Sequence, residues 1–167
     1  MAATAQITGM TYHRRRSVAA DEQFLLEVYA QSRAEELTRS GMDAQQREVF
    51  VQMQFRIRQA AYSATHPIAS DEILCADDGT ALGRVLTDRT ADGICLVDIA
   101  IAPEKQRQGI GTQVIQELQQ ECISHHWKMS LHVLKDSSAE RLYRRLGFRL
   151  SGEDSFRRQM VWDGTKI

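Results

Sequence analysis

The feature that most constrains this chain is an apolar strand that runs through a short polar loop and two glycines into an amphipathic helix. The predicted strand ends at Ile101, Pro103 begins the loop, and Gly109 and Gly111 stand at the start of the helix. Amides in the first turn of a helix have no partner within the helix, and the helix dipole places partial positive charge there. Glycine also lets a ligand approach the main chain closely. This order of elements predicts a binding site for a phosphate or diphosphate.

The residue pattern of the loop excludes two common kinds of nucleotide site. The loop lacks the Gly-Lys-Ser/Thr of a Walker loop, and Val114 stands where a dinucleotide fold has its third glycine. The pattern that is left is Gln/Arg-x-x-Gly-x-Gly, filled as Gln106-Arg107-Gln108-Gly109-Ile110-Gly111. It resembles motif A of the GNAT N-acetyltransferases, which bind the pyrophosphate of acetyl-CoA. For these six residues alone, an ordinary glycine-containing turn is the alternative interpretation.

A second stretch agrees with the first. Residues 136–148 read Asp-Ser-Ser-Ala-Glu-Arg-Leu-Tyr-Arg-Arg-Leu-Gly-Phe and resemble the family's downstream motif, Asn-x-x-Ala-x-x-Leu-Tyr-x-x-Leu-Gly-Phe. The stretch predicts a short helix that Ser137 or Ser138 caps and that Gly147 ends in a left-handed conformation. With both motifs, the chain is identified as a member of the GNAT family, and the resemblance covers roughly residues 72–162.

Size and composition narrow the class of protein. The 167 residues can bury a substantial core, so we expect one GNAT domain over residues 1–167. The net charge of −1, from 21 basic and 22 acidic residues, disfavours a nucleic-acid partner. No apolar run is long enough to span a membrane, which predicts a cytoplasmic protein without a membrane partner. Cys75, Cys95 and Cys122 form no Cys-x-x-Cys pair, so we expect buried core thiols and neither a zinc site nor a disulfide.

Hydrophobic periodicity predicts a mixed α/β order of elements. After frayed residues 1–10, we expect elements in this order: a strand at 10–16; helices at 21–37, capped by Asp21, and 43–62; strands at 72–76, 81–87 and 94–101; a helix at 109–126; a strand at 128–134; the motif helix; and strands at 148–152 and 157–162. The second helix carries apolar residues at helical spacing: Val49, Phe50, Met53, Ile57, Ala60 and Ala61. The helix at 109–126 is expected to bury Val114, Ile115, Leu118, Cys122 and Ile123. The Arg14–Arg16 triplet suits a solvated strand end.

An antiparallel meander followed by a right-handed crossover to a parallel strand suits the GNAT acyl-CoA N-acyltransferase fold. The resemblance implies a mixed central sheet with splayed parallel strands, flanked by helices, and it implies the acetyl-CoA contacts. The main chain at Ile99 and Ile101 would pair with the pantetheine amides and polarise the acetyl carbonyl. The remaining cofactor contacts would be Gln106, Arg107, Gln108, Gly109, Ile110, Gly111, Thr112, Asp136, Ala139 and Tyr143. Asp136 departs from the family's asparagine, because an aspartate keeps the acceptor but loses the amide donor.

Acetyl transfer needs a neutral amine, a polarised thioester carbonyl and a protonated leaving thiolate, and none of these requires a metal. Tyr143 matches the family's tyrosine near the CoA sulfur and is either the general acid or a packing residue. His132 lies beside the expected splay and is either the general base or a hydrogen-bonded core histidine. Asp98 interrupts an apolar strand, so it either faces the substrate, where it would be a second candidate base, or is bonded structurally.

The expected function is therefore acetyl transfer from acetyl-CoA, as co-substrate, to a primary amine by direct attack in a ternary complex. The acceptor would be a small-molecule or protein amine, bound by residues of the second helix, and the chain is compatible with a homodimer. Candidate acceptor contacts are Gln52, Gln54, Phe55, Arg58 and Tyr62. The alternative is a catalytically weak GNAT-fold module that binds acyl-CoA as a sensor or partner subunit, which Asp136 and the uncertain base favour.

Overall fold

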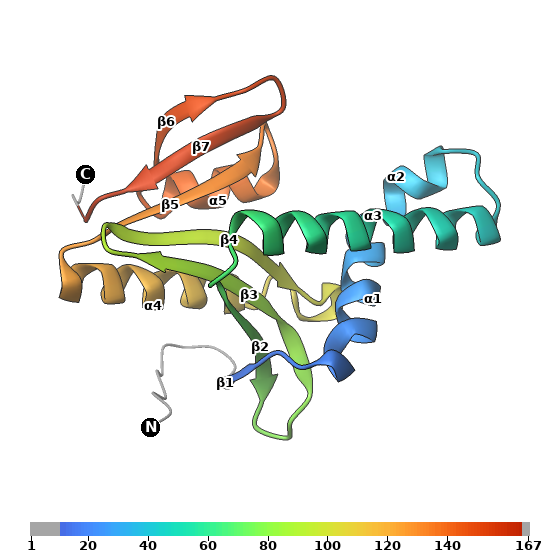
Figure 1. Cartoon of the computed structure of the whole chain (residues 1–167), viewed down its shortest axis with the longest axis horizontal. Helices are drawn as coiled ribbons and strands as arrows, with labels where there is room; N and C mark the ends of the chain where they lie inside the picture. Colours follow the sequence, from blue (N-terminus) through green and yellow to red (C-terminus); the bar gives the residue numbers. More distant parts are fainter. Residues whose placement is uncertain (1–10, 165–167) are drawn as a thin grey trace.

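A seven-stranded mixed sheet organises the chain in the computed structural model, which describes residues 11–164 (Figure 1). The strand order is β1-β2-β3-β4-β5-β7-β6, with β4 and β5 parallel and every other neighbouring pair antiparallel. The predicted meander and parallel crossover are thus confirmed. The strands are β1 (Tyr12–Arg16), β2 (Ser70–Ala76), β3 (Ala81–Thr90), β4 (Gly93–Ile101), β5 (Lys128–Leu134), β6 (Arg149–Glu153) and β7 (Arg157–Trp162). Predictions for residues 1–10 lie outside the described residues.

The predicted first helix is divided in two, and the other helices lie close to their predicted positions. Asp43 caps the long third helix by accepting from the Gln46 amide at 2.9 Å. Asp21 does not cap the first helix, because its carboxylate pairs with Arg15 and accepts from the Val18 amide. The helical elements are η1 (Ala19–Asp21), α1 (Glu22–Ser32), α2 (Ala34–Arg39), α3 (Ala44–Thr65), η2 (Pro103–Lys105), α4 (Ile110–His125) and α5 (Ser138–Arg145). Within residues 11–164, no helix is both long enough and apolar enough to cross a membrane.

The helices cover the two faces of the sheet with separate cores. On one face, α4 and α5 pack on the sheet around Val114, Leu118 and Leu131, all nearly inaccessible to solvent. On the other face, Leu25 of α1 and Phe55 of α3 pack on β2. Apolar burial of this kind is the dominant favourable contribution to folding. Because α1 and α3 reach only part of their face, the face of β5 opposite α4 carries no helix (Figure 1).

The apolar stripe predicted on the second helix does not lie in the core. Val49, Met53 and Ile57 are exposed, and α3 instead buries Val51 and Phe55. Figure 1 shows the reason: the N-terminal half of α3 extends beyond the sheet toward α2, so much of its surface has no partner layer.

Three other expectations about burial need correction. Ile123 of α4, expected in the core, is half-exposed, and Cys95 is half-buried, whereas Cys75 and Cys122 are buried as expected. All three thiols are free. The Arg14–Arg16 triplet is not wholly solvated, because Arg14 is half-buried and pairs with Glu117 of α4 at 2.5 Å.

The two parallel strands start close together and then diverge. Only Gly93–Leu96 of β4 pairs with β5, up to Leu131, although both strands continue. A Cβ atom on Gly93 would lie 2.1 Å from the Lys128 carbonyl oxygen, so the close start requires glycine. A β-bulge against β3 follows between Leu96 and Asp98 and shifts the register of β4 at the point of divergence. The expected splay is therefore present, and it leaves one edge of β4 open.

Glu140 fastens α5 to β7 and shows how the second motif is stabilised. Its buried carboxylate accepts from Arg144, Arg158 and the Asp136 amide. The hydrogen bond from Arg144 is the largest of the causes that lower the pKa of Glu140 to about 2. A buried carboxylate with this many donors is stabilised in its ionised form.

We expect Glu140→Gln to lower the thermal midpoint at pH 7 and to remove part of its acid dependence. Because the pKa of Glu140 is lowered on folding, its contribution to stability is present above the unfolded value of about 4.3 and is lost as the pH falls toward 2. Melting curves from pH 2 to 7 should show the two proteins converging at low pH. A constant difference across that range would contradict the pairing.

Candidate active site

The loop between β4 and α4 forms a row of free amides. Gln106 and Gln108 brace the loop by donating side-chain amide hydrogens to the carbonyls of Ile101, at 2.9 Å, and Glu104, at 3.1 Å. Arg107 and Gly109 have positive φ, 61° and 84°. Backbone amides 107–112 make no hydrogen bond among the residues that the structure describes, and the first bond of the helix is that of Gln113. Residues 106–112, hereafter the phosphate cradle, combine these donors with a helix N-terminus, as an anion site requires.

Glycine stands at the two cradle positions for different physical reasons. Gly109 adopts a left-handed conformation that disfavours any residue with a Cβ atom. Gly111 does not, and a Cβ atom there would meet only the Ile101 side chain, at 3.9 Å. The fold therefore does not require glycine at 111, and its effect is to keep the adjacent amides open. Ile110 has a buried side chain, so only its main chain can reach a ligand.

The open edge of β4 precedes the cradle in the chain, and only Ala102 and the short helix η2 separate them. Beyond Leu96 the strand pairs only with β3, because β5 has diverged. Ile99 and Ile101 lie in this segment, and their side chains pack against the core on the α4 face. An unpaired strand edge offers alternating amides and carbonyls to an extended ligand, as in strand addition. The predicted main-chain contacts at these two residues therefore lie in the segment with an open edge.

Tyr143 of α5 is buried beside this edge. Only 7% of it is exposed, its ring packs edge-on against Phe148, and its hydroxyl has no hydrogen-bond partner in the described part of the chain. Burial, and to a lesser extent the negative charge of Asp98, raises the pKa of Tyr143 to about 12. The phenol is therefore protonated at neutral pH, with a proton free to donate. Ala139, one turn earlier, is half-buried against the same core.

Asp98 lies in an ion-pair cluster on the opposite face of the sheet. Its Oδ1 accepts from Arg58 of α3 at 2.7 Å, and Arg84 of β3 lies 4.0 Å from Oδ2. Arg58 also donates to the Tyr62 hydroxyl at 2.5 Å and lies over the rings of Tyr29 and Tyr62. These five residues, hereafter the Arg58 cluster, show that Asp98 is bonded structurally, as one of its two interpretations had it.

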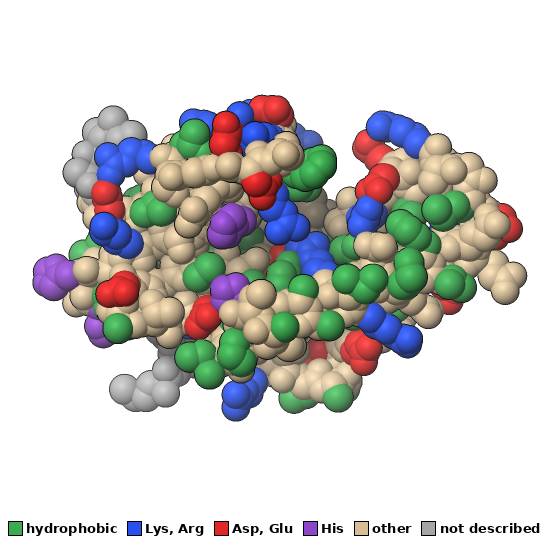
Figure 2. Space-filling model, turned by 45° about the horizontal axis from the view of Figure 1, so that its top comes forward, with side chains coloured by type: hydrophobic (Ala, Val, Ile, Leu, Met, Phe, Trp, Pro, Cys, Tyr) green, Lys and Arg blue, Asp and Glu red, His purple; other side chains and the backbone are tan. Residues whose placement is uncertain are grey.

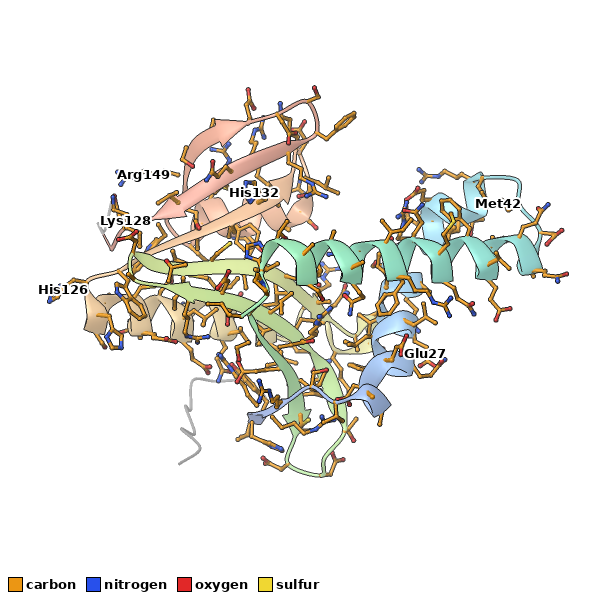
Figure 3. The ribbon with its side chains drawn as sticks, in the orientation of Figure 1. Glu27, Met42, His126, Lys128, His132 and Arg149 are labelled. Carbon is orange, nitrogen blue, oxygen red and sulfur yellow. The ribbon has the colours of Figure 1, made fainter. Side chains whose placement is uncertain are left out.

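His132 lies on the same face as the Arg58 cluster. Met129, Leu131 and Val133 of β5 are buried under α4, so the alternation of the strand turns His132 away from that core. It is exposed, and its ring makes no hydrogen bond to residues 11–164, so the core-histidine interpretation is wrong. Figure 3 shows His132 on β5, near the C-terminal end of α3 in that view.

Asp136 has its unusual charge partly offset. It adopts φ 59°, its side chain is exposed, and it lies 3.5 Å from Arg158 of β7. Its amide donates to Glu140, so the residue holds the turn through its main chain. An aspartate tolerates the left-handed conformation better than most residues do.

The candidate acceptor residues of α3 separate into different surroundings. Arg58 and Tyr62 belong to the Arg58 cluster, whereas Phe55 is in the core, and Gln52 lines a separate open pocket with α1. Gln54 is half-buried, and no contact places it at the site. Sequence reasoning missed Tyr29 and Arg84. The signal for Arg84 was present, because it is a charged residue within the apolar strand Ala81–Thr90.

Asp98 joins the Arg58 cluster to the open edge of β4, because it lies in the segment of β4 that does not pair with β5. Figure 2 shows the surface hollowed between the lobe of β5–β7 and the lobe of α2 and α3, with basic side chains at its floor and a histidine beside them. A further open pocket of about 740 Å³ adjoins the cradle and is lined by residues of α1 and α2 together with Pro103 and Gln106. The site therefore combines an anion-binding loop, an open strand edge, a protonated phenol and a charged recess.

The comparisons with known proteins agree with this geometry. Residues 31–163 match the family model described as an acetyltransferase (GNAT) domain. No curated protein matches the sequence.

Solved structures share the fold at low sequence identity. The PaiA N-acetyltransferase of Thermoplasma acidophilum, in complex with coenzyme A, has 18% identity and a TM-score of 0.66 over 92% of this chain and 99% of its own. A GNAT-family acetyltransferase of Listeria monocytogenes has 14% identity and a TM-score of 0.64 over 96% and 99%. Ard1 of Thermoplasma volcanium has 15% identity and a TM-score of 0.60 over 93% and 99%. With a family model that matches most of its length and with both sequence motifs folded as a cradle and a capped helix, the chain belongs to the GNAT family of acetyltransferases.

Proposed function

We propose that this protein transfers the acetyl group of acetyl-CoA to a primary amine by direct attack in a ternary complex. The observation that carries the proposal is the row of free amides at 107–112, which closely follows the open edge of β4 in the chain. Their positions fit a diphosphate followed by an extended pantetheine arm. Coenzyme A is bound by the similar PaiA structure, which supports the same ligand here.

The chain's own groups supply the remaining chemistry. Bound acetyl-CoA supplies the thioester and the leaving thiolate. Main-chain amides of β4 near Ile99 polarise the carbonyl as the amine nitrogen attacks. The C–S bond breaks as the C–N bond forms, and Tyr143 gives its proton to the departing sulfur. The raised pKa of Tyr143, about 12, keeps the phenol protonated at neutral pH, so its proton is present when the C–S bond breaks and negative charge develops on the sulfur.

His132 is the better of the two candidate bases. A carboxylate oxygen of Asp98 is already held by Arg58, whereas the imidazole of His132 is exposed and without a partner among the described residues. Histidine is also the side chain whose ordinary pKa lies nearest to neutral pH. We therefore assign removal of the amine proton to His132, directly or through water, and a positioning role to Asp98.

Acceptor-dependent release of CoA tests the proposal. The protein is incubated with acetyl-CoA and each member of a panel of primary amines. The free thiol is detected with a chromogenic reagent, and mass spectrometry shows whether the amine has gained one acetyl group. Release that rises with amine concentration supports transfer. Tight acetyl-CoA binding with no transfer to any amine would contradict it and favour the sensor or partner-subunit alternative.

Arg107→Ala is expected to raise the KM for acetyl-CoA while leaving kcat nearly unchanged. The Arg107 side chain is exposed, so its charge is screened, and a contact with phosphate would contribute about 1–3 kcal/mol. Alanine meets the same backbone strain as arginine at φ 61°, so the change isolates the charge. Steady-state kinetics measure both constants. A large fall in kcat at constant KM would place Arg107 at the acceptor instead.

A further inference from the structure

Arg58 is held in one position by contacts on several sides. Its Nε donates to the Tyr62 hydroxyl and its Nη2 to Asp98. Its guanidinium carbon lies 5.5 Å from the ring centre of Tyr29 and 5.4 Å from that of Tyr62. A guanidinium fixed by hydrogen bonds and aromatic rings loses little freedom when a ligand binds.

Arg58 nevertheless keeps donors for a ligand. Its Nη1 makes no hydrogen bond with residues 11–164, and 42% of its side chain is exposed to solvent. Arg84, behind it, is different: it is buried, and all three of its nitrogens bond to Asp71 or Gln59. Arg58 is therefore the member of the cluster whose guanidinium can accept a new anionic partner.

The charges around Arg58 disfavour a second cation. Asp98 lies between two guanidiniums, one at 2.7 Å and one at 4.0 Å, so both would repel an ammonium group that approached it. An anion at Nη1 would be attracted chiefly by the Arg58 guanidinium that it contacts, because Asp71 already neutralises much of the charge of Arg84. Carboxylate and phosphate also match the forked donors of arginine, which bind such groups through two parallel hydrogen bonds.

The Arg58 cluster adjoins the groups to which the proposed function assigns the chemistry. Asp98 precedes Ile99 on β4, and its charge acts on the Tyr143 phenol across the strand. His132 lies on the same face of the sheet. A ligand anchored at Arg58 would therefore lie beside the segment of β4 that has the open edge and on the face of the sheet that carries His132.

From this arrangement we infer that the amine acceptor carries a carboxylate or phosphate group and that Arg58 binds it. The inference rests on the proposed acetyl transfer and specifies its acceptor class: amines of the amino-acid or aminoalkyl-phosphate type, rather than diamines or neutral amines.

Matched acceptors test the inference. We would compare kcat/KM, with concentrations expressed as the neutral amine, for glycine against glycinamide, β-alanine against its amide, phosphoethanolamine against ethanolamine, and 1,4-diaminobutane. The anionic member of each pair should be favoured by about tenfold or more, as for a hydrogen bond to a charged group. The carboxylate and phosphate pairs show which anion is preferred. Equal or better transfer to amides, ethanolamine or the diamine would overturn the inference and leave acetyl transfer intact.

Substitution of Arg58 separates recognition from folding. Arg58→Gln should bring the anionic preference close to one, and Arg58→Lys should retain part of it, with the KM for acetyl-CoA unchanged in both. Arg56→Gln, on the exposed side of the same helix, is the matched control and should behave like the unchanged protein. An equal loss of kcat/KM for anionic and neutral acceptors in Arg58→Gln would show a merely structural role and overturn the inference.

A binding measurement keeps the inference testable without turnover. In the presence of CoA, N-acetylglycine should raise the thermal midpoint of the unchanged protein more than its amide does, and Arg58→Gln should abolish the difference. Selective binding without transfer to any amine would contradict the proposed function alone. If the protein shows no selective binding and no transfer, the result would overturn both the inference about the acceptor and the proposed function.

Discussion

Tyr143→Phe is expected to lower kcat by about 10²-fold or more, the usual contribution of a general acid, while the affinity for acetyl-CoA changes little. The ring is buried against Phe148 and is retained in the variant, so only the hydroxyl is removed. That hydroxyl has no hydrogen-bond partner among the described residues, so its loss leaves no protein group unpaired. The variant should therefore fold as the unchanged protein does.

The pH dependence gives Tyr143 a second signature. Its pKa of about 12 means that ionisation of the phenol cannot cause an alkaline decline in rate below about pH 10. The same raised pKa affects stability. The contribution of the phenol to the free energy of unfolding is complete below pH 10 and is lost as the pH rises toward 12, and the phenylalanine variant should not show this loss. Single-turnover rates should be compared from pH 6 to 10, so that product release does not mask the chemical step. Equal rates for both proteins would reduce Tyr143 to a packing residue.

Gly111→Asp is expected to weaken acetyl-CoA binding by about 10²-fold or more, because it sets a negative charge where the diphosphate would lie. The variant should remain folded. Position 111 has helical backbone and room for a Cβ atom, and an acidic residue in the first turn of a helix is favourable. Calorimetric titration with acetyl-CoA measures the affinity, and a melting curve confirms the fold.

Two companion variants separate charge from size at position 111. Gly111→Asn has nearly the same volume as the aspartate without its charge, and Gly111→Ala adds only a methyl group. Affinity should fall in the order alanine, asparagine, aspartate, with the largest step at the charge. A folded aspartate variant with unchanged affinity would show that the diphosphate does not bind at the phosphate cradle.

Elements determined by neighbouring residues were predictable from the sequence. The cradle and α4 follow from the order of strand, proline, glycines and helix, and α5 begins with its Ser137 cap and ends before Gly147. The break between α1 and α2 was not predictable in this way. Periodicity predicts one helix over residues 21–37, but the interruption falls at Arg33, whose side chain bonds to Tyr29 and Glu36.

Features that depend on tertiary contacts could not be predicted from local sequence patterns. Periodicity identifies the apolar faces of a helix but not which of them packs against another element. Val49, Met53 and Ile57 were therefore read as part of an apolar face, whereas in the structure they are exposed. The ion pair between Arg58 and Asp98 joins residues 40 positions apart, and Arg84 completes it from a third element. The sequence showed a carboxylate in an apolar strand, whereas its partners became known only from the fold.

Transfer of a labelled acetyl group in a single turnover tests the central claim most directly. Enzyme in excess over acetyl-labelled acetyl-CoA is mixed with a saturating anionic amine and quenched at successive times. The label should pass from acetyl-CoA to the amine at the rate at which free CoA appears, with none on the protein, and omission of the amine should leave acetyl-CoA intact. Label that first accumulates on the protein, or that appears as acetate regardless of the amine, would contradict direct attack in a ternary complex.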